Sequence, residues 1–226
     1  MKYLKLFESF KDIDSICDEY HIEDYTINSD GTVDVNGDVN LNGQIRNKNN
    51  LPLKFGTVSG HFTCSFNNLT TLKGAPTYVG GMFLCNRNEL VTLEGGPKYV
   101  IGSFGCTDNQ LINLNGAPIE VDGNFECYSN KLVTLEGTPT HVGGRFDCHN
   151  NRLIDLEGLP RKIDKVLCHD NPISSIYYLF PDHKSFMESL DYDYLRGTSI
   201  IKWRFKESLN ELGIEMPKYI TGWNWI

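Results

Sequence analysis

The stretch Val79-GGMFLCNRNELVTLEGGPK-Tyr99 decides the fold, because the next 21 residues, Val100-IGSFGCTDNQLINLNGAPI-Glu120, follow the same pattern. The shared pattern is V-x-G-x-F-x-C-x-x-N-x-L-x-x-L-x-G-x-P-x-x. Units that match it begin at Val58, Val79, Val100, Val121 and Val142. A fixed period of about 20 to 29 residues is typical of a solenoid, in which each unit makes one coil. The sequence therefore predicts stacked coils.

Six of the seven cysteines keep this period, and an asparagine follows each of them three residues later. The six are Cys64, Cys85, Cys106, Cys127, Cys148 and Cys168. Regularly spaced thiols could bind zinc or an iron–sulfur cluster. However, one thiol per coil forms a single column with a spacing of about 4.8 Å, which does not gather four ligands around one point. We therefore expect buried, inert cysteines, with no disulfide, no metal and no cofactor.

Each part of the repeat has a physical interpretation. In F-x-C the apolar residues alternate with the others, as in a strand with one buried face, so stacked units predict a parallel sheet. The asparagine follows where the chain turns, and its amide can bond to backbone groups of neighbouring turns. The two leucines re-enter the core, the glycine permits a second corner, and the proline favours an extended return. No room remains for an α-helix on the return side.

These repeats resemble leucine-rich repeats, L-x-x-L-x-L-x-x-N/C-x-L, with phenylalanine and cysteine at strand positions that usually hold leucine. Among the variants they look most like the short repeats of bacterial leucine-rich effectors. The G-x-P corner and the V-x-G start are similar to repeat proteins of large tailed bacteriophages, as is the opening MKYLKLFESF. The resemblance implies an α/β-type solenoid, a ribbon of about seven coils with a parallel concave sheet and an extended convex side.

The open ends of a solenoid core need caps. Residues 1–36 contain a helical pattern, followed by alternating residues around Asp30-Gly31 that predict a β-hairpin. Residues 37–181 are the predicted solenoid, and residues 182–226 form a predicted helical cap with helices over 182–190 and 199–212. We expect the terminal TGWNWI to pack on the last repeats, because two exposed tryptophans would be unusual.

Composition excludes several functional classes. With 21 Lys+Arg against 29 Asp+Glu, the net charge of −8 has the wrong sign for a protein that neutralises phosphates, so nucleic acid is not an expected partner. No apolar run approaches the ~18 residues that span a membrane. Lys5 and Glu8 interrupt the N-terminal segment, which does not resemble a secretory signal. We expect a cytoplasmic protein, in the host cytoplasm if it is phage-encoded, with no membrane association.

The outward residues of the predicted strands differ at nearly every coil, whereas the inward residues hardly vary. A specific binding face would show this variation, and so would unconstrained solvent-exposed positions. His149 and His169, next to Asp147 and Asp170, could bind a metal or transfer a proton, but contact residues on an exposed sheet are the simpler interpretation. Tyrosine and arginine are favoured at interface hot spots. The predicted partner-binding residues are Met82, Leu84, Glu126, Tyr128, Arg145, Asp147, His149, Lys165 and His169.

No nucleophile elbow, phosphate loop or zinc-protease motif is present, so no catalytic residue is predicted. The predicted function is non-catalytic protein binding by the concave sheet. The phage resemblance implies a bacterial partner, as for an inhibitor of a host defence or metabolic factor, and a homodimer is a further possibility.

Two alternatives stay open. The first is an effector or enzyme with activity in residues 182–226, although ubiquitin-ligase effectors of similar repeats carry a larger domain with a reactive cysteine, and no cysteine follows Cys168. The second is sequestration of a small ligand by an oligomer.

Overall fold

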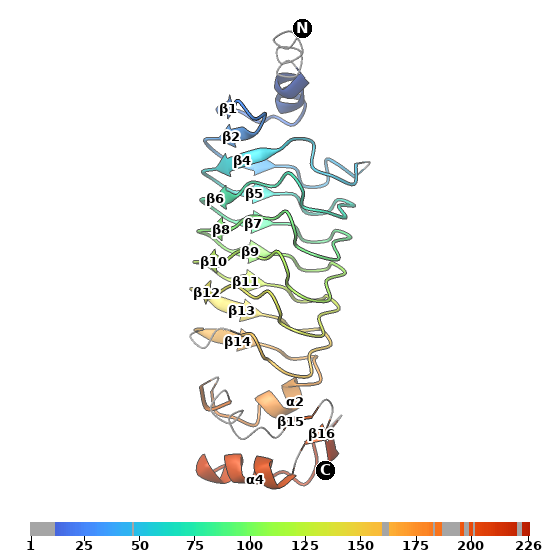
Figure 1. The fold of residues 1–226 in the computed structure, drawn as a ribbon, viewed down its shortest axis with the longest axis vertical. Coiled ribbons are helices and arrows are strands. Elements are labelled where there is room, and N and C mark those ends of the chain that lie inside the picture. Colours follow the sequence, from blue (N-terminus) through green and yellow to red (C-terminus); the bar gives the residue numbers. More distant parts are fainter. Residues whose placement is uncertain are drawn as a thin grey trace.

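The protein is an elongated β-solenoid of about six turns, against the predicted seven. The structure is a computed structural model that describes residues 12–46, 48–159, 163–182, 184–186, 195–196, 199–200, 202–220 and 223–226. Figure 1 shows the coils stacked along the long axis of the molecule, with an N-terminal helical segment at one end and α4 (Lys202–Glu211) at the other. Each coil contacts its two neighbours along this axis.

Two parallel sheets run the length of the solenoid, where the sequence analysis predicted one. The F-x-C strands form the predicted sheet, sheet B, which contains β3 (Val39–Asn40), β5 (Phe62–Thr63), β7 (Phe83–Leu84), β9 (Phe104–Gly105), β11 (Phe125–Glu126), β13 (Arg145–Asp147) and β14 (Lys165–Leu167). The additional sheet, sheet A, contains β2 (Val33–Val35), β4 (Phe55–Val58), β6 (Tyr78–Val79), β8 (Tyr99–Val100), β10 (Glu120–Val121) and β12 (His141–Val142). The single-sheet prediction was therefore wrong.

A glycine corner separates the two sheets within each coil. At Gly102 an added Cβ would lie 2.6 Å from the carbonyl carbon of Gly81 in the preceding coil. Any side chain would push the coils apart at this point, which is why glycine recurs there. The corner bends the chain between Val100 and Phe104, so both point into the core from different sheets.

The third side of each coil holds the two leucines and has no assigned strand among the described residues. Backbone hydrogen bonds still join its coils, for example from the Gln110 amide to the Leu90 carbonyl oxygen at 2.9 Å. Gly116 ends this side with φ +89°, and an added Cβ there would lie 2.3 Å from the Glu94 nitrogen. The extended return side is confirmed, since the repeats contain little helix.

The core consists of columns of identical side chains. Five phenylalanines stack along the axis with nearly parallel rings, and the centroids of Phe83 and Phe104 lie 5.4 Å apart. The column consists of Phe62, Phe83, Phe104, Phe125 and Phe146. The repeat cysteines and leucines form parallel columns and are fully buried. Because every coil presents the same shape to the next, one packing solution serves the whole solenoid.

A column of asparagines connects successive coils at the corner after sheet B. Asn109 donates from Nδ2 to the carbonyl oxygens of Cys85, Cys106 and Thr107 at 3.0 to 3.2 Å. Its Oδ1 accepts from the Leu90 amide at 3.1 Å. The same bonds recur at Asn67, Asn88, Asn130, Asn151 and Asn171. The predicted role of the repeat asparagine in bonding neighbouring turns is confirmed.

The N-terminal end carries a helical segment over residues 12–19 and a hairpin. β1 (Tyr25–Ile27) pairs antiparallel with β2, which continues into sheet A through β4. Ile13, Cys17 and Tyr20 of this end are buried against the first coils, whereas the predicted helix start at Ser9 lies outside the described residues.

The C-terminal end contains α2 (Ser174–Tyr177), α4 and a small sheet of β15 (Leu195–Arg196), β16 (Ser199–Ile200) and β17 (Asn224–Trp225). Residues 199–200 are a strand, so the predicted helix begins later, at Lys202. Of the predicted helix over 182–190, residues 184–186 are helical and 183 and 187–190 lie outside the described part. Trp223 is buried and donates from Nε1 to the Pro172 carbonyl oxygen at 2.9 Å, which confirms the predicted packing for this residue. The three-part domain division stays a prediction.

Candidate functional site

All nine predicted binding residues lie along the outer face of sheet B, but they fall into two groups. Met82 and Leu84 belong to the coil of β7, and Met82 is 37% exposed. The coil of β9 separates them from the others and presents only Gly105 in the middle column. The remaining seven lie together on the coils of β11, β13 and β14. These seven residues form what we call the polar cluster: Glu126, Tyr128, Arg145, Asp147, His149, Lys165 and His169.

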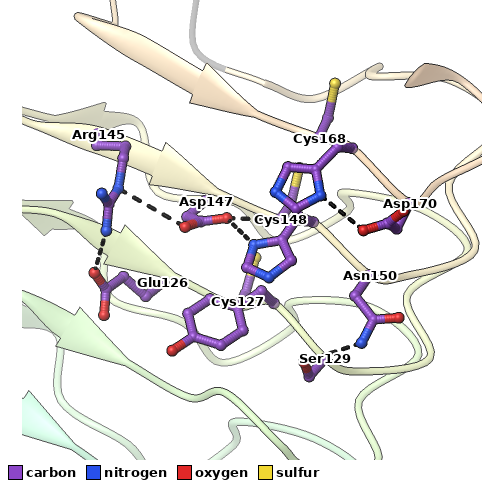
Figure 2. A network of polar contacts seen from close by, with 12 residues as sticks. Glu126, Cys127, Ser129, Arg145, Asp147, Cys148, Asn150, Cys168 and Asp170 are labelled. Atoms are coloured by element: carbon purple, nitrogen blue, oxygen red, sulfur yellow. Dashed lines mark hydrogen bonds and ion pairs between the residues drawn. The ribbon is translucent and has the colours of Figure 1, made fainter. Parts of the chain in front are cut away.

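Asp147 is the centre of the polar cluster, and it is buried although its strand position points outward. Its residue exposure is 4%. One carboxylate oxygen, Oδ1, lies 2.6 Å from His149 Nδ1, and Oδ2 lies 3.8 Å from Arg145 Nε. Figure 2 shows the carboxylate of Asp147 beside Arg145, with a dashed line that marks their ion pair. Burying a carboxylate is costly unless such partners compensate it.

Arg145 connects two carboxylates on adjacent strands. Its Nη2 donates to Glu126 Oε1 at 2.7 Å, as Figure 2 shows. Glu126 and Asp147 are direct neighbours in the register of β11 and β13, where two like charges repel each other. The guanidinium therefore compensates a repulsion that the strand register imposes. Arg145 Nε is itself buried without a hydrogen bond, so the ion pair with Asp147 is its nearest compensation.

Three flat rings stack beside this network. The centroids of Tyr128 and His149 lie 4.4 Å apart, and those of His149 and His169 lie 4.3 Å apart, with planes 15° and 17° from parallel. His169 Nδ1 also lies 2.8 Å from Asp170 Oδ2. Stacking holds the three rings as one column, and the Nδ1 atoms of both histidines face carboxylates.

Two corner contacts complete the site and were not among the predicted residues. Asp170 pairs with His169, and Asn150 donates from Nδ2 to Ser129 Oγ at 3.1 Å, as Figure 2 shows. Ser129, Asn150 and Asp170 each directly precede a repeat asparagine and have φ between 53° and 56°. Their position in the repeat was readable from the sequence, but their left-handed backbone, which turns them beside the ring column, was not.

The chemistry that this arrangement supports is recognition by charged and aromatic groups. Two imidazole–carboxylate pairs could in principle transfer protons. However, the cysteines behind the cluster are fully buried in the core, so they offer no accessible thiol beside these pairs. In the described part of the chain, no three His, Cys, Asp or Glu side chains come together in a way that could hold a metal ion. Within the same residues, no helix is long and apolar enough to cross a bilayer.

Two open hollows lie near the N-terminal end. The smaller, of about 270 Å³, is lined by seven residues: Asp24, Thr26, Asp34, Val35, Asn36, Thr57 and Ser59. The larger, of about 630 Å³, is lined by residues of the helical segment and by residues 50–54. Neither is lined by a predicted site residue.

No family model matches the sequence, and no similar characterised protein or solved structure was found. The chain is therefore described by its fold alone. It is a β-solenoid with repeats of about 21 residues and two parallel sheets.

The seven cysteines are all free and buried. Burial away from water raises the pKa of the Cys64 thiol to about 12 and that of Cys168 to about 12. Burial, with Asp14 adding to it, raises the pKa of the Cys17 thiol to about 11. Because the thiolate is the reactive form, these thiols are poor nucleophiles and poor metal ligands at neutral pH.

We expect the free energy of unfolding to fall as the pH rises above 9, the ordinary pKa of these thiols. In the unfolded chain the thiols ionise near 9.0, whereas in the folded chain Cys64 and Cys168 keep their protons to about 12. Folding therefore takes up protons in this window, and stability is complete below pH 9 and declines above it. Above pH 9, each such thiol lowers the free energy of unfolding by up to about 1.4 kcal/mol per pH unit. Urea unfolding at pH 8, 9.5 and 10.5 measures the decline.

A Cys64→Ala variant is the control for this pH dependence. It should be less stable at neutral pH because of the cavity, but its decline with pH should be shallower by up to about 1.4 kcal/mol per unit. A stability that stays constant to pH 10.5 contradicts the prediction. So does rapid labelling of several native thiols at pH 8 without denaturant.

Proposed function

We propose that the protein is a non-catalytic binding module that recognises a partner protein through the polar cluster on the outer face of sheet B. The observation that carries this proposal is the burial of Asp147 in a network that the repeat does not need. Of the equivalent positions on other coils, only Glu126, which belongs to the same network, bears a charge; the others hold Asn40, Thr63, Leu84, Gly105 and Leu167. The fold is built without the network, so its presence on three adjacent coils needs another reason.

The cluster has the properties of an interface centre. Tyr128 and Arg145 are residue types that dominate binding energy at hot spots. The stack and the ion pairs hold these side chains in place before binding, which reduces the conformational entropy lost on association. The cluster contains both signs of charge, so a matching partner must present complementary charges in a fixed arrangement.

The class of partner follows from the resemblance of the repeats rather than from the geometry. The repeats are similar to leucine-rich repeats, and that kinship is part of the proposal, supported by the paired leucines and the asparagine corner. The similarity to repeat proteins of bacteria and their phages makes a bacterial protein, bound or inhibited in the cytoplasm, the first partner to test.

The test is capture of a partner from bacterial lysate by wild-type protein and by a Tyr128→Ala/Arg145→Ala/His149→Ala variant. We expect the triple variant to lose the partner, because it removes the hot-spot types and the ring stack. A matched control, Lys98→Ala/Tyr99→Ala/His141→Ala, changes similar residue types on the exposed face of sheet A and should retain it. Equal recovery by both triple variants would refute the proposal.

The triple variant also leaves Asp147 without its partners, which lowers stability. A second variant, Tyr128→Ala/Lys165→Glu, keeps Arg145 and His149, the direct partners of Asp147, and should still weaken binding at least tenfold. Its melting temperature should remain close to that of the wild type. If this variant binds as the wild type does, the polar cluster is not the interface.

A further inference from the structure

The third side of the solenoid, between the asparagine corner and the corner at Gly116 and its equivalents, exposes an aliphatic stripe. Val91, Ile112 and Val133 occupy the same position on three consecutive coils and are 58%, 53% and 52% exposed. Thr70 and Ile154 continue the stripe at its two ends. Three β-branched apolar side chains in a row on a regular surface form a continuous apolar ridge rather than scattered exposure. The fold does not require them, because the coil of β5 holds Thr70 there.

A second column, two residues earlier in each repeat, runs beside the stripe and changes charge along the axis. Its members, in order, are Asn68, Glu89, Gln110, Lys131 and Arg152, and all are exposed. Lys131 and Arg152 are neighbours on successive coils, where like charges repel. Among the described residues, none of the three charged side chains makes an ion pair or a hydrogen bond. The column is therefore acidic toward one end, basic toward the other, and uncompensated within the chain.

We propose that this side is a self-association interface on which a second copy of the chain packs antiparallel, about a two-fold axis that crosses the stripe at Ile112. The axis reverses the order of coils and keeps each column opposite itself. Glu89 then faces Lys131 of the second copy, and Val91 faces its Val133. Because a two-fold interface is isologous, each pairing occurs twice. The two stripes match in register, since both have the spacing of the coils.

A parallel arrangement satisfies fewer charges. Each residue of the charged column would then face the residue on the opposite side of the stripe in the equivalent coil. Arg152 would meet Asp155, while Glu89 and Lys131 would have no charged partner. A third column consists of the residues directly before Gly116 and its equivalents. In the antiparallel arrangement this column adds one attraction, between Lys73 and Glu157, and one repulsion, between Glu94 and Glu136. That outer column is balanced, so the pairing of Glu89 with Lys131 decides the direction.

The size of this side sets the strength of the association. Five coils at a spacing of about 4.8 Å give a contact about 24 Å long. Stable interfaces bury about 800 Å² on each partner, and one side of five coils is a small surface by that measure. We therefore expect a reversible dimer with a Kd in the micromolar range. The polar cluster lies on a different side of the coil, so the dimer presents two copies of the proposed binding face and gains avidity.

Sedimentation velocity over a concentration series tests the interface through charge reversal. Glu89→Lys and Lys131→Glu should each weaken self-association at least tenfold, because each sets two pairs of like charges opposite one another. An equimolar mixture of these two variants should dimerise again, since every like-charge pair becomes an opposite-charge pair. The double variant Glu89→Lys/Lys131→Glu should dimerise as the wild type does. The mixing result is specific to the antiparallel geometry.

Three outcomes would overturn the proposal: a wild-type protein that stays monomeric at several hundred micromolar, single reversals without effect, or a mixture that does not recover. Lys98→Glu, an equal change of charge on sheet A, should leave the dimer unchanged. The Tyr128→Ala/Arg145→Ala/His149→Ala variant should also dimerise normally, so failure of the dimer and failure of the proposed partner binding are separate results.

Discussion

Replacing Asn109 with alanine should lower the free energy of unfolding by about 2 to 4 kcal/mol. The Leu90 amide loses its hydrogen bond to Asn109 Oδ1, and Leu90 is fully buried. A buried amide without a partner costs about 1 to 3 kcal/mol. The carbonyl oxygens of Cys85 and Cys106 keep one bond each, from Asn88 and Asn130, so their losses are smaller. The rest of the effect comes from the cavity and from the weaker tie between two coils.

Two further variants make the result specific to the asparagine column. Asn109→Asp keeps the volume but points a carboxylate at three carbonyl oxygens, so it should be at least as destabilising as alanine. Asn113→Ala removes an asparagine of the same coil that is half-buried and accepts one bond from the Asn115 amide, and should cost less than about 1 kcal/mol. Urea unfolding measures all three. Equal stabilities for Asn109→Ala and Asn113→Ala would show that the column does not connect the coils.

The repeat made most of this architecture predictable, because one correct interpretation applies to every coil. Alternation in F-x-C places Phe104 and Cys106 in the core, and the period then does so for each equivalent residue. The second sheet could not be predicted from alternation in the same way. Val100 and Phe104 are four residues apart, so alternation alone is consistent with one strand that passes through Gly102. The structure shows a bend at residues 101 and 102 and places Val100 and Phe104 in different sheets.

The polar cluster shows where sequence reasoning ends. Alternation correctly places Asp147 on the outer face, but alternation alone does not predict its burial. Its cover comes from Arg145 and His149 together with residues of the adjacent coils, and it depends on register between coils. The final unit is one residue short, yet Lys165 still pairs with Arg145 and His169 still stacks on His149. The missing residue must therefore lie before the strand, as the interval from Ile163 to Cys168 indicates.

Replacing Phe104 with alanine should lower the free energy of unfolding by about 3 to 5 kcal/mol. The ring is fully buried and stacks on Phe83 at 5.4 Å and on Phe125 at 5.2 Å. Alanine would leave a cavity with an aromatic ring on each side, and the stacked backbones limit how far the coils can close around it. Phe104→Leu fills most of the space and should cost less than half as much. Urea unfolding with an unchanged circular dichroism spectrum before the transition is the measurement.

The position of a ring in the column should set the size of its effect. Phe104 has two stacked neighbours, whereas Phe146, at the end of the column, stacks only on Phe125 and faces Val166 on the other side. Each aromatic pair contributes about 0.5 to 1.5 kcal/mol beyond the area it buries. Phe146→Ala should therefore cost about 1 kcal/mol less than Phe104→Ala, although both rings are fully buried. If the two variants are equally destabilised, burial alone explains the column, and contact between rings of successive coils adds nothing to stability.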